Sequence, residues 1–167
     1  MFNVNFLNRK EVVEFLKAWL PVVYSIASIG FENLEKYGIY IFPVEECELK
    51  EAGGQCIAYA SGYYITYRKD MDINSAWNVI LHEVIHAMIG YPAVEFLQGG
   101  KTAFPVDTET LMYGFFVNEL IAYSLQRAAT SMDSMEECIK YACEKIMVPL
   151  YAPIVGREEF IKTLLNS

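Results

Sequence analysis

The chain has few of the residues that most often do chemistry: only two of its 167 residues are histidines. Basic residues are also scarce, with 13 Lys and Arg against 21 Asp and Glu, which gives a formal net charge of -8. Binding to nucleic acid depends on clustered Lys and Arg that neutralise phosphates. We therefore expect no nucleic-acid partner.

The four cysteines include no CxxC pair. Cys138 and Cys143 lie five positions apart on an expected helix and point in different directions, which disfavours a shared zinc ion. The N-terminus lacks the basic and apolar regions of a secretory signal, so reduced cysteines are favoured over a disulfide framework. The longest apolar run, from Leu20 to Phe31, is interrupted and shorter than the roughly 20 residues that span a bilayer. We expect a cytoplasmic protein with no membrane span.

Apolar residues nevertheless make up 54% of the chain, including 12 Tyr and 10 Phe. This composition can bury a substantial core and excludes intrinsic disorder. The length favours a single domain over 1–167. Within it we expect a helical N-terminal part over 1–37, a sheet with two long helices over 38–130, and C-terminal helices over 131–167.

The expected order of elements is helices, then a small sheet, then helices, which is typical of the α+β class. Apolar periodicity predicts a helix over 9–19. Pro21 then marks a break or the start of a second helix that continues to Tyr37 and stops at Gly38.

A short strand is expected over 39–42, ended by Pro43, and a hairpin over 55–68 that turns at Ser61-Gly62. The result would be a short twisted sheet or hairpin with an edge strand. Four later helices are expected: one capped by Asp72 or Asn74 and reaching Ile89, one from Asp107 or Thr108 to about Ala129, one around 135–147 with a capping box of Ser134 and Glu137, and one near 157–165.

Both histidines fall in one motif, His82-Glu83-Val84-Ile85-His86. Random placement would give this pattern in about one chain in a thousand of this composition. On a helix, residues four apart point the same way, with Cβ atoms about 6 Å apart. Two imidazoles so placed can bind one zinc ion at about 2.0–2.1 Å. Glu83 leans over the same site without being a ligand.

The alternative is a pair of surface histidines with an ordinary glutamate between them. The neighbouring residues, however, make this helix apolar nearly all round, which is typical of a buried helix. Burying two histidines and a glutamate without partners is unfavourable. The surroundings of the motif therefore favour a metal site.

A catalytic zinc has three protein ligands and one open position, and no histidine remains for the third. Glu119 is the only charged residue in the apolar run 111–125, where an unpaired carboxylate would be unfavourable. The alternative is that Glu119 faces solvent or pairs with a surface lysine. Glu95 and Glu109 also compete, but Glu95 lies just past a proline and Glu109 in a first helical turn, where carboxylates interact with the helix dipole. We favour Glu119.

The HEVIH motif, followed on the next long helix by NELIAY, resembles the zincin metallopeptidases whose third zinc ligand is a glutamate, the gluzincin arrangement. The resemblance covers roughly residues 55–129. It implies zinc ligation by His82, His86 and Glu119, with Glu83 as general base. The activity it implies is hydrolysis of peptide bonds by a zinc-activated water.

The resemblance also implies a strand before the motif, here Tyr63 to Tyr67, that aligns an extended substrate by β-addition. The oxyanion must be stabilised without a further histidine, which leaves Tyr123 or Arg127 as candidates; a core tyrosine and a solvent-facing arginine are the alternatives. Asn118 and Asp107 are possible hydrogen-bond partners for the zinc-binding histidines.

Three interpretations of the whole chain compete. The first is a cytoplasmic zinc metallopeptidase, a hydrolase acting on a peptide or protein substrate. The second is a catalytically inactive zincin-fold protein that works as a binding or sensor module through protein–protein interaction. The third treats the apolar run and the many aromatic residues as a partner- or membrane-facing surface. Glu83 favours the first, because a purely structural metal has no use for a general base beside it.

Overall fold

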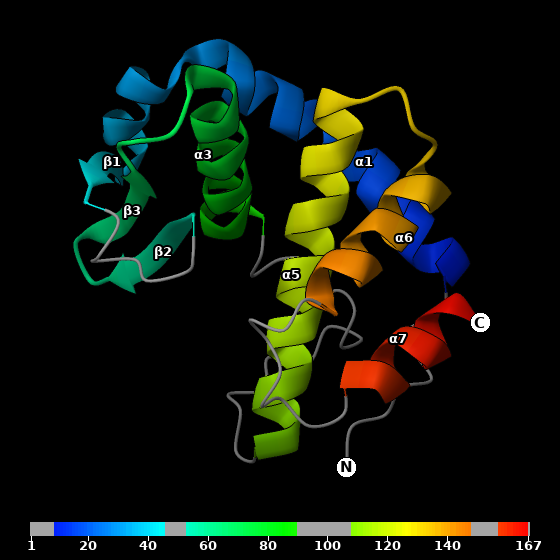
Figure 1. The fold of residues 1–167 in the computed structure, drawn as a ribbon. Helices are drawn as coiled ribbons and strands as arrows, with labels where there is room; N and C mark the ends of the chain where they lie inside the picture. Colours follow the sequence, from blue (N-terminus) through cyan, green and yellow to red (C-terminus); the bar gives the residue numbers. More distant parts are fainter. Residues whose placement is uncertain (1–8, 46–52, 90–107, 148–156, 167) are drawn as a thin grey trace.

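The computed structural model describes residues 9–45, 53–89, 108–147 and 157–166 (Figure 1). Its α+β architecture confirms the expected fold class: an N-terminal helix, a three-stranded mixed sheet and then further helices. The elements are α1 (Arg9–Ile29), η2 (Phe31–Tyr37), β1 (Ile39–Val44), β2 (Gly54–Tyr59), β3 (Gly62–Arg68), α3 (Ile73–Met88), α5 (Thr108–Thr130), α6 (Met135–Ile146) and α7 (Arg157–Leu165).

Helix α3 lies between the sheet and α5, and α6 packs on the other side of α5 (Figure 1). Two apolar clusters hold these layers together. One joins α1, α3, α5 and α6 and includes Leu81, Ile85 and Leu120. The other lies between α3 and the sheet and includes Ile65 and Val84. Both faces of α3 are thus buried, as its nearly uniform apolar sequence predicts.

The strand order is β1-β3-β2, with β1 parallel and β2 antiparallel to β3. The strand over 63–67, which was expected to align a substrate by β-addition, is β3, and its hydrogen bonds on both sides leave no free edge for an added strand. Among the described strands, β2 and β1 form the edges. Pro43 lies inside β1 rather than ending it, which an edge strand tolerates. The hairpin turns at Ala60-Ser61, one residue earlier than expected, because Tyr59 pairs with Gly62.

Helix α1 continues through Pro21, so the expected break at that residue was wrong. Proline removes one helical hydrogen bond, but buried residues on both sides of it, such as Leu16 and Val23, hold the helix against the core. The helix ends before Gly30, whose φ of 88° departs from the helical region. The segment after it forms the 3-10 helix η2 rather than α-helix.

By length and composition alone, α1 is long and apolar enough to cross a membrane, with 28% of its most apolar stretch buried inside the protein. A core helix of a soluble protein passes the same test, and α1 contacts α5 and α6. The expectation of no membrane span stays a prediction.

The helix starts agree with the capping signals. Asp72 caps α3 by accepting a hydrogen bond from the backbone of Ser75 at 2.9 Å. Ser134 and Glu137 form the complete capping box of α6. These two caps fix where the helices begin.

Candidate metal centre

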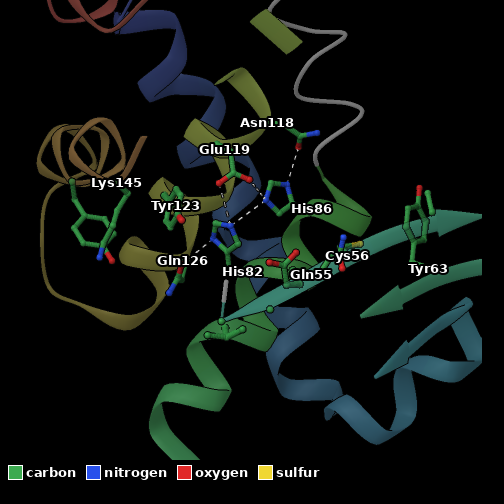
Figure 2. Close-up of a pocket in the computed structure, with 16 residues that line it drawn as sticks. Gln55, Cys56, Tyr63, His82, His86, Asn118, Glu119, Tyr123, Gln126 and Lys145 are labelled. Atoms are coloured by element: carbon green, nitrogen blue, oxygen red, sulfur yellow. Dashed lines mark hydrogen bonds and ion pairs between the residues drawn. The ribbon is translucent and has the colours of Figure 1, made fainter. Parts of the chain in front are cut away.

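Helices α3 and α5 bring three predicted site residues together. His82 and His86 lie one turn apart on α3 and face α5, and Glu119 projects from α5 between them (Figure 2). His82 and Glu119 are only 7% and 8% exposed. Burying this much polar surface between two apolar helices is unfavourable unless the groups satisfy one another or bind a cation.

The distances among the three side chains suit one small cation. The Nε2 atoms of the two histidines are 3.1 Å apart. The Glu119 carboxylate oxygens lie 2.7 Å from Nε2 of His86 and 3.7 Å from Nε2 of His82. Tetrahedral ligands at 2.0–2.1 Å from zinc are about 3.3 Å from one another. His82, His86 and Glu119 are therefore a group that could hold a metal ion.

The outer ring nitrogens fix which atoms face the centre. Nδ1 of His86 lies 3.1 Å from the side-chain oxygen of Asn118, and Nδ1 of His82 lies 3.0 Å from that of Gln126. An amide oxygen can only accept, so each Nδ1 carries the hydrogen and each neutral ring presents its Nε2 lone pair to Glu119. Three electron-pair donors that converge in this way require a proton or a metal cation among them.

Of the two proposed partners of the histidines, Asn118 is confirmed, and Asp107 lies outside the described residues. The sequence reasoning missed Gln126. It lies seven residues after Glu119, two helical turns along the same face of α5, and that spacing is the signal that could have identified it. The competing ligand Glu95 and the side chain of Glu109 also lie outside the part of the chain that is described.

Without a metal, a proton joins the ligands. Burial lowers the pKa of His86, but the Glu119 carboxylate that accepts its hydrogen bond outweighs this and raises that pKa to about 9. Burial raises the pKa of Glu119, but the two neighbouring histidines outweigh burial, with the protonated His86 as hydrogen-bond donor at 2.7 Å, and hold that pKa well below its usual range. The metal-free site is therefore an imidazolium–carboxylate pair at neutral pH.

We expect the stability of the metal-free protein to fall at alkaline pH. A raised histidine pKa stabilises the fold fully below about 6.5 and stops doing so as the pH rises through about 9. The lowered pKa of Glu119 stabilises the fold above its ordinary value and is lost only in strong acid. Urea unfolding with a chelator present should show that the free energy of unfolding falls by an amount on the order of 2 kcal/mol between pH 6.5 and 9.5. Glu119→Gln should remove most of this dependence of stability on pH. An equal dependence in the wild type and the variant would contradict the ion pair between His86 and Glu119.

Glu83 lies one residue after His82 and lines a pocket of about 750 Å³ that opens onto the group of His82, His86 and Glu119. Burial raises the pKa of its carboxyl, which the two histidines partly oppose. Among the described residues, no hydrogen-bond donor contacts this carboxylate. On the sheet side, the Cys56 thiol lines the same pocket, and burial, with a contribution from Glu83, raises its pKa to about 12. Glu83 is thus a partly buried acid that faces the pocket, and no described residue donates a hydrogen bond to its oxygen atoms.

The structure separates the two candidates for oxyanion stabilisation. Tyr123 lines the pocket, and its ring centroid lies 4.2 Å from that of His82. Arg127 is not among the residues that line the pocket; it forms a 2.8 Å ion pair with Asp133 and lies over the ring of Tyr141. The catalytic role of Tyr123 stays a prediction, and Arg127 has a structural role between α5 and α6.

The pocket has three walls. Strand β2 forms one, with Gly54, Gln55 and Cys56 and with Gly53 just before the strand; helices α3 and α5 form the second, and α6 forms the third. Gly54 sets how closely β2 approaches α3. A Cβ atom there would overlap a methyl group of Val79 and would lie 3.0 Å from the carbonyl oxygen of Thr66 and 3.5 Å from Cγ of Glu83.

We expect Gly54→Ala to push β2 away from α3 and to destabilise the fold by about 1–3 kcal/mol, as overpacking of a tight contact does. Gly53→Ala is the matched control, because its Cβ would meet the movable end of Met71 at 3.0 Å. Thermal and urea unfolding of both variants would measure the difference. Equal stabilities would show that the contact between β2 and α3 can relax.

Comparisons with protein families, with curated proteins and with solved structures found no match for this chain. The structure itself defines the class of site. It is an α+β fold in which an HExxH helix and a later helix together present a buried His, His and Glu group that could hold a metal ion, consistent with a zincin-like site.

Proposed function

We propose that the protein is a zinc-dependent metallopeptidase that hydrolyses peptide bonds. The observation that supports this most strongly is the convergence of His82, His86 and Glu119 beside a carboxylate, Glu83, that faces an open pocket. Two imidazole nitrogens and one carboxylate are a donor set that suits zinc and leaves a fourth position for water or substrate. When bound, zinc lowers the pKa of a water molecule towards 7 and polarises the scissile carbonyl.

Glu83 performs the proton transfers in this proposal. Its carboxylate accepts a proton from the attacking water as the new carbon–oxygen bond forms, and then delivers that proton to the leaving amine as the carbon–nitrogen bond breaks. Its raised pKa suits this exchange, because a base with a higher pKa accepts the proton more readily. It stays free to do so because no described residue donates a hydrogen bond to it.

Strand β2, rather than β3, aligns the substrate. Among the described strands β2 pairs only with β3, and it borders the pocket beside Glu83. An extended peptide can add to such an edge through backbone hydrogen bonds while its side chains alternate between pocket and solvent. Tyr123, beside His82, is the donor that we assign to the developing oxyanion.

The direct test is incubation of the zinc-loaded protein with a mixture of peptides of diverse sequence, followed by mass spectrometry of the products. We expect discrete cleavages that a chelator abolishes and that added zinc restores. Uncleaved peptides, with one zinc bound per chain, would exclude the peptidase and favour a binding or sensor role for the same site.

A further inference from the structure

We infer that Lys145 selects substrates that carry a carboxylate near the scissile bond. The inference rests on the proposed peptide site and adds a substrate class to it. Lys145 lies in the last turn of α6 and is the only lysine or arginine among the described residues that line the metal pocket. In Figure 2 it lies on the opposite side of the metal-binding group from Cys56 and Tyr63 of the sheet.

Aromatic contacts hold Lys145 at this wall. Its Nζ lies 5.5 Å from the ring centroid of Tyr141, a cation–π contact. The Tyr141 ring in turn lies 6.4 Å from Tyr123, and Tyr123 lies 4.2 Å from the His82 ring. An extended residue spans about 3.3–3.6 Å. A peptide whose scissile carbonyl lies at the metal-binding group therefore reaches Lys145 within a few residues.

Among the described residues Lys145 has no carboxylate partner. Arg127, the other cation on the Tyr141 ring, already pairs with Asp133. Lys145 is half-buried rather than fully solvated, so pairing with an anion is worth more there than on the open surface. A carboxylate of the substrate is the group whose charge it would match.

The charge of the site supports the same assignment. The protein has a net charge of -8 and would repel acidic peptides in general. Around the metal-binding group, Glu83 and Glu119 offset the two charges of a zinc ion. Lys145 makes this part of the pocket positive, so a carboxylate of the substrate is attracted to it. The carboxylate can come from an acidic side chain or from the C-terminus of the peptide.

The test measures binding separately from cleavage. Zinc-loaded Glu83→Gln protein is titrated by calorimetry with three unlabelled, N-acetylated hexapeptide mixtures built from uncharged residues: one with a free C-terminal carboxylate, one amidated, and one amidated with a single glutamate. We expect one of the two mixtures that contain a carboxylate to bind about tenfold more tightly than the mixture without one. Which of the two binds more tightly shows whether the carboxylate comes from a side chain or from the C-terminus.

When Lys145→Gln is added, the ratio of the two affinities should fall from about ten to about one. Lys140→Gln, on an exposed part of α6, should leave it unchanged. A preference that survives Lys145→Gln, no preference in the parent protein, or no saturable binding of any mixture would overturn the inference. Cleavage by the wild-type protein is measured in parallel, so a failure of the peptidase proposal is recognised independently of the binding preference.

Discussion

Replacing Glu119 by alanine is expected to reduce zinc affinity at least about 100-fold while the chain stays folded. Glu119 places its carboxylate oxygens 2.7 and 3.7 Å from the two Nε2 atoms, and loss of even a residue that only orients a ligand weakens metal binding about 10- to 100-fold. Competition with a chromophoric chelator measures the affinity, and circular dichroism reports the fold. Glu136→Ala, on an exposed part of α6, is the matched control.

An unchanged zinc affinity in Glu119→Ala would mean that another group is the third ligand. Glu119→Gln refines the result, because it keeps the size of the side chain and one oxygen but removes the charge. We expect it to bind zinc more weakly than the wild type and more tightly than the alanine variant.

The second large effect is expected from Glu83→Gln, which should lower peptide cleavage about 10²- to 10⁴-fold and leave zinc content at the wild-type level. Glutamine keeps the shape of the side chain but cannot accept the proton of the attacking water. Glu83 does not belong to the group of potential ligands, so the metal should remain. Cleavage rates and zinc content are measured on the same preparations, again with Glu136→Ala as the control.

This variant also separates the two main interpretations of the chain. A binding or sensor protein would not depend on Glu83, so its zinc content and partner affinity would be indifferent to the change. Full cleavage activity in Glu83→Gln would contradict the assignment of the general base. A loss of zinc together with activity would instead place Glu83 among the ligands.

Local patterns predicted the helices well because their ends are determined by neighbouring residues. The Asp72 cap and the capping box of Ser134 and Glu137 need only residues three positions apart. The prediction of a helix break at Pro21 failed because the tendency of proline to break helices is local. The burial of α1 on both sides of Pro21 depends instead on its packing against α5 and α6. Tertiary packing overrode the local signal.

The sheet order was beyond the sequence patterns. Strands β2 and β3 are neighbours in sequence and form a hairpin. Strand β1 could have paired with the free edge of either β2 or β3. Its parallel pairing with β3 places Ile39 opposite Tyr63 and leaves β2 at the edge beside Glu83. That choice depends on how the sheet packs on α3, and in the proposed function it determines which strand receives a peptide.

In the candidate site, too, some residues could be predicted from local patterns and others could not. His82 and His86 were predictable because four residues make about one helical turn, and Glu119 stood out as the only charge in an apolar run. Gln126 and Gly54 were missed because their roles depend on contacts between distant elements. No local pattern states which face of α5 meets α3, or how closely β2 approaches it.

The central claim is that His82, His86 and Glu119 bind one zinc ion, and titration of the metal-free wild-type protein with zinc at pH 7.5 tests it most directly. Calorimetry in buffers of different ionisation enthalpy measures stoichiometry and proton release together. We expect one zinc per chain and about one proton released, because His86, with a pKa of about 9 in the metal-free protein, must lose its proton to bind the metal. Absence of saturable zinc binding would contradict the account, and binding without proton release would place the metal elsewhere.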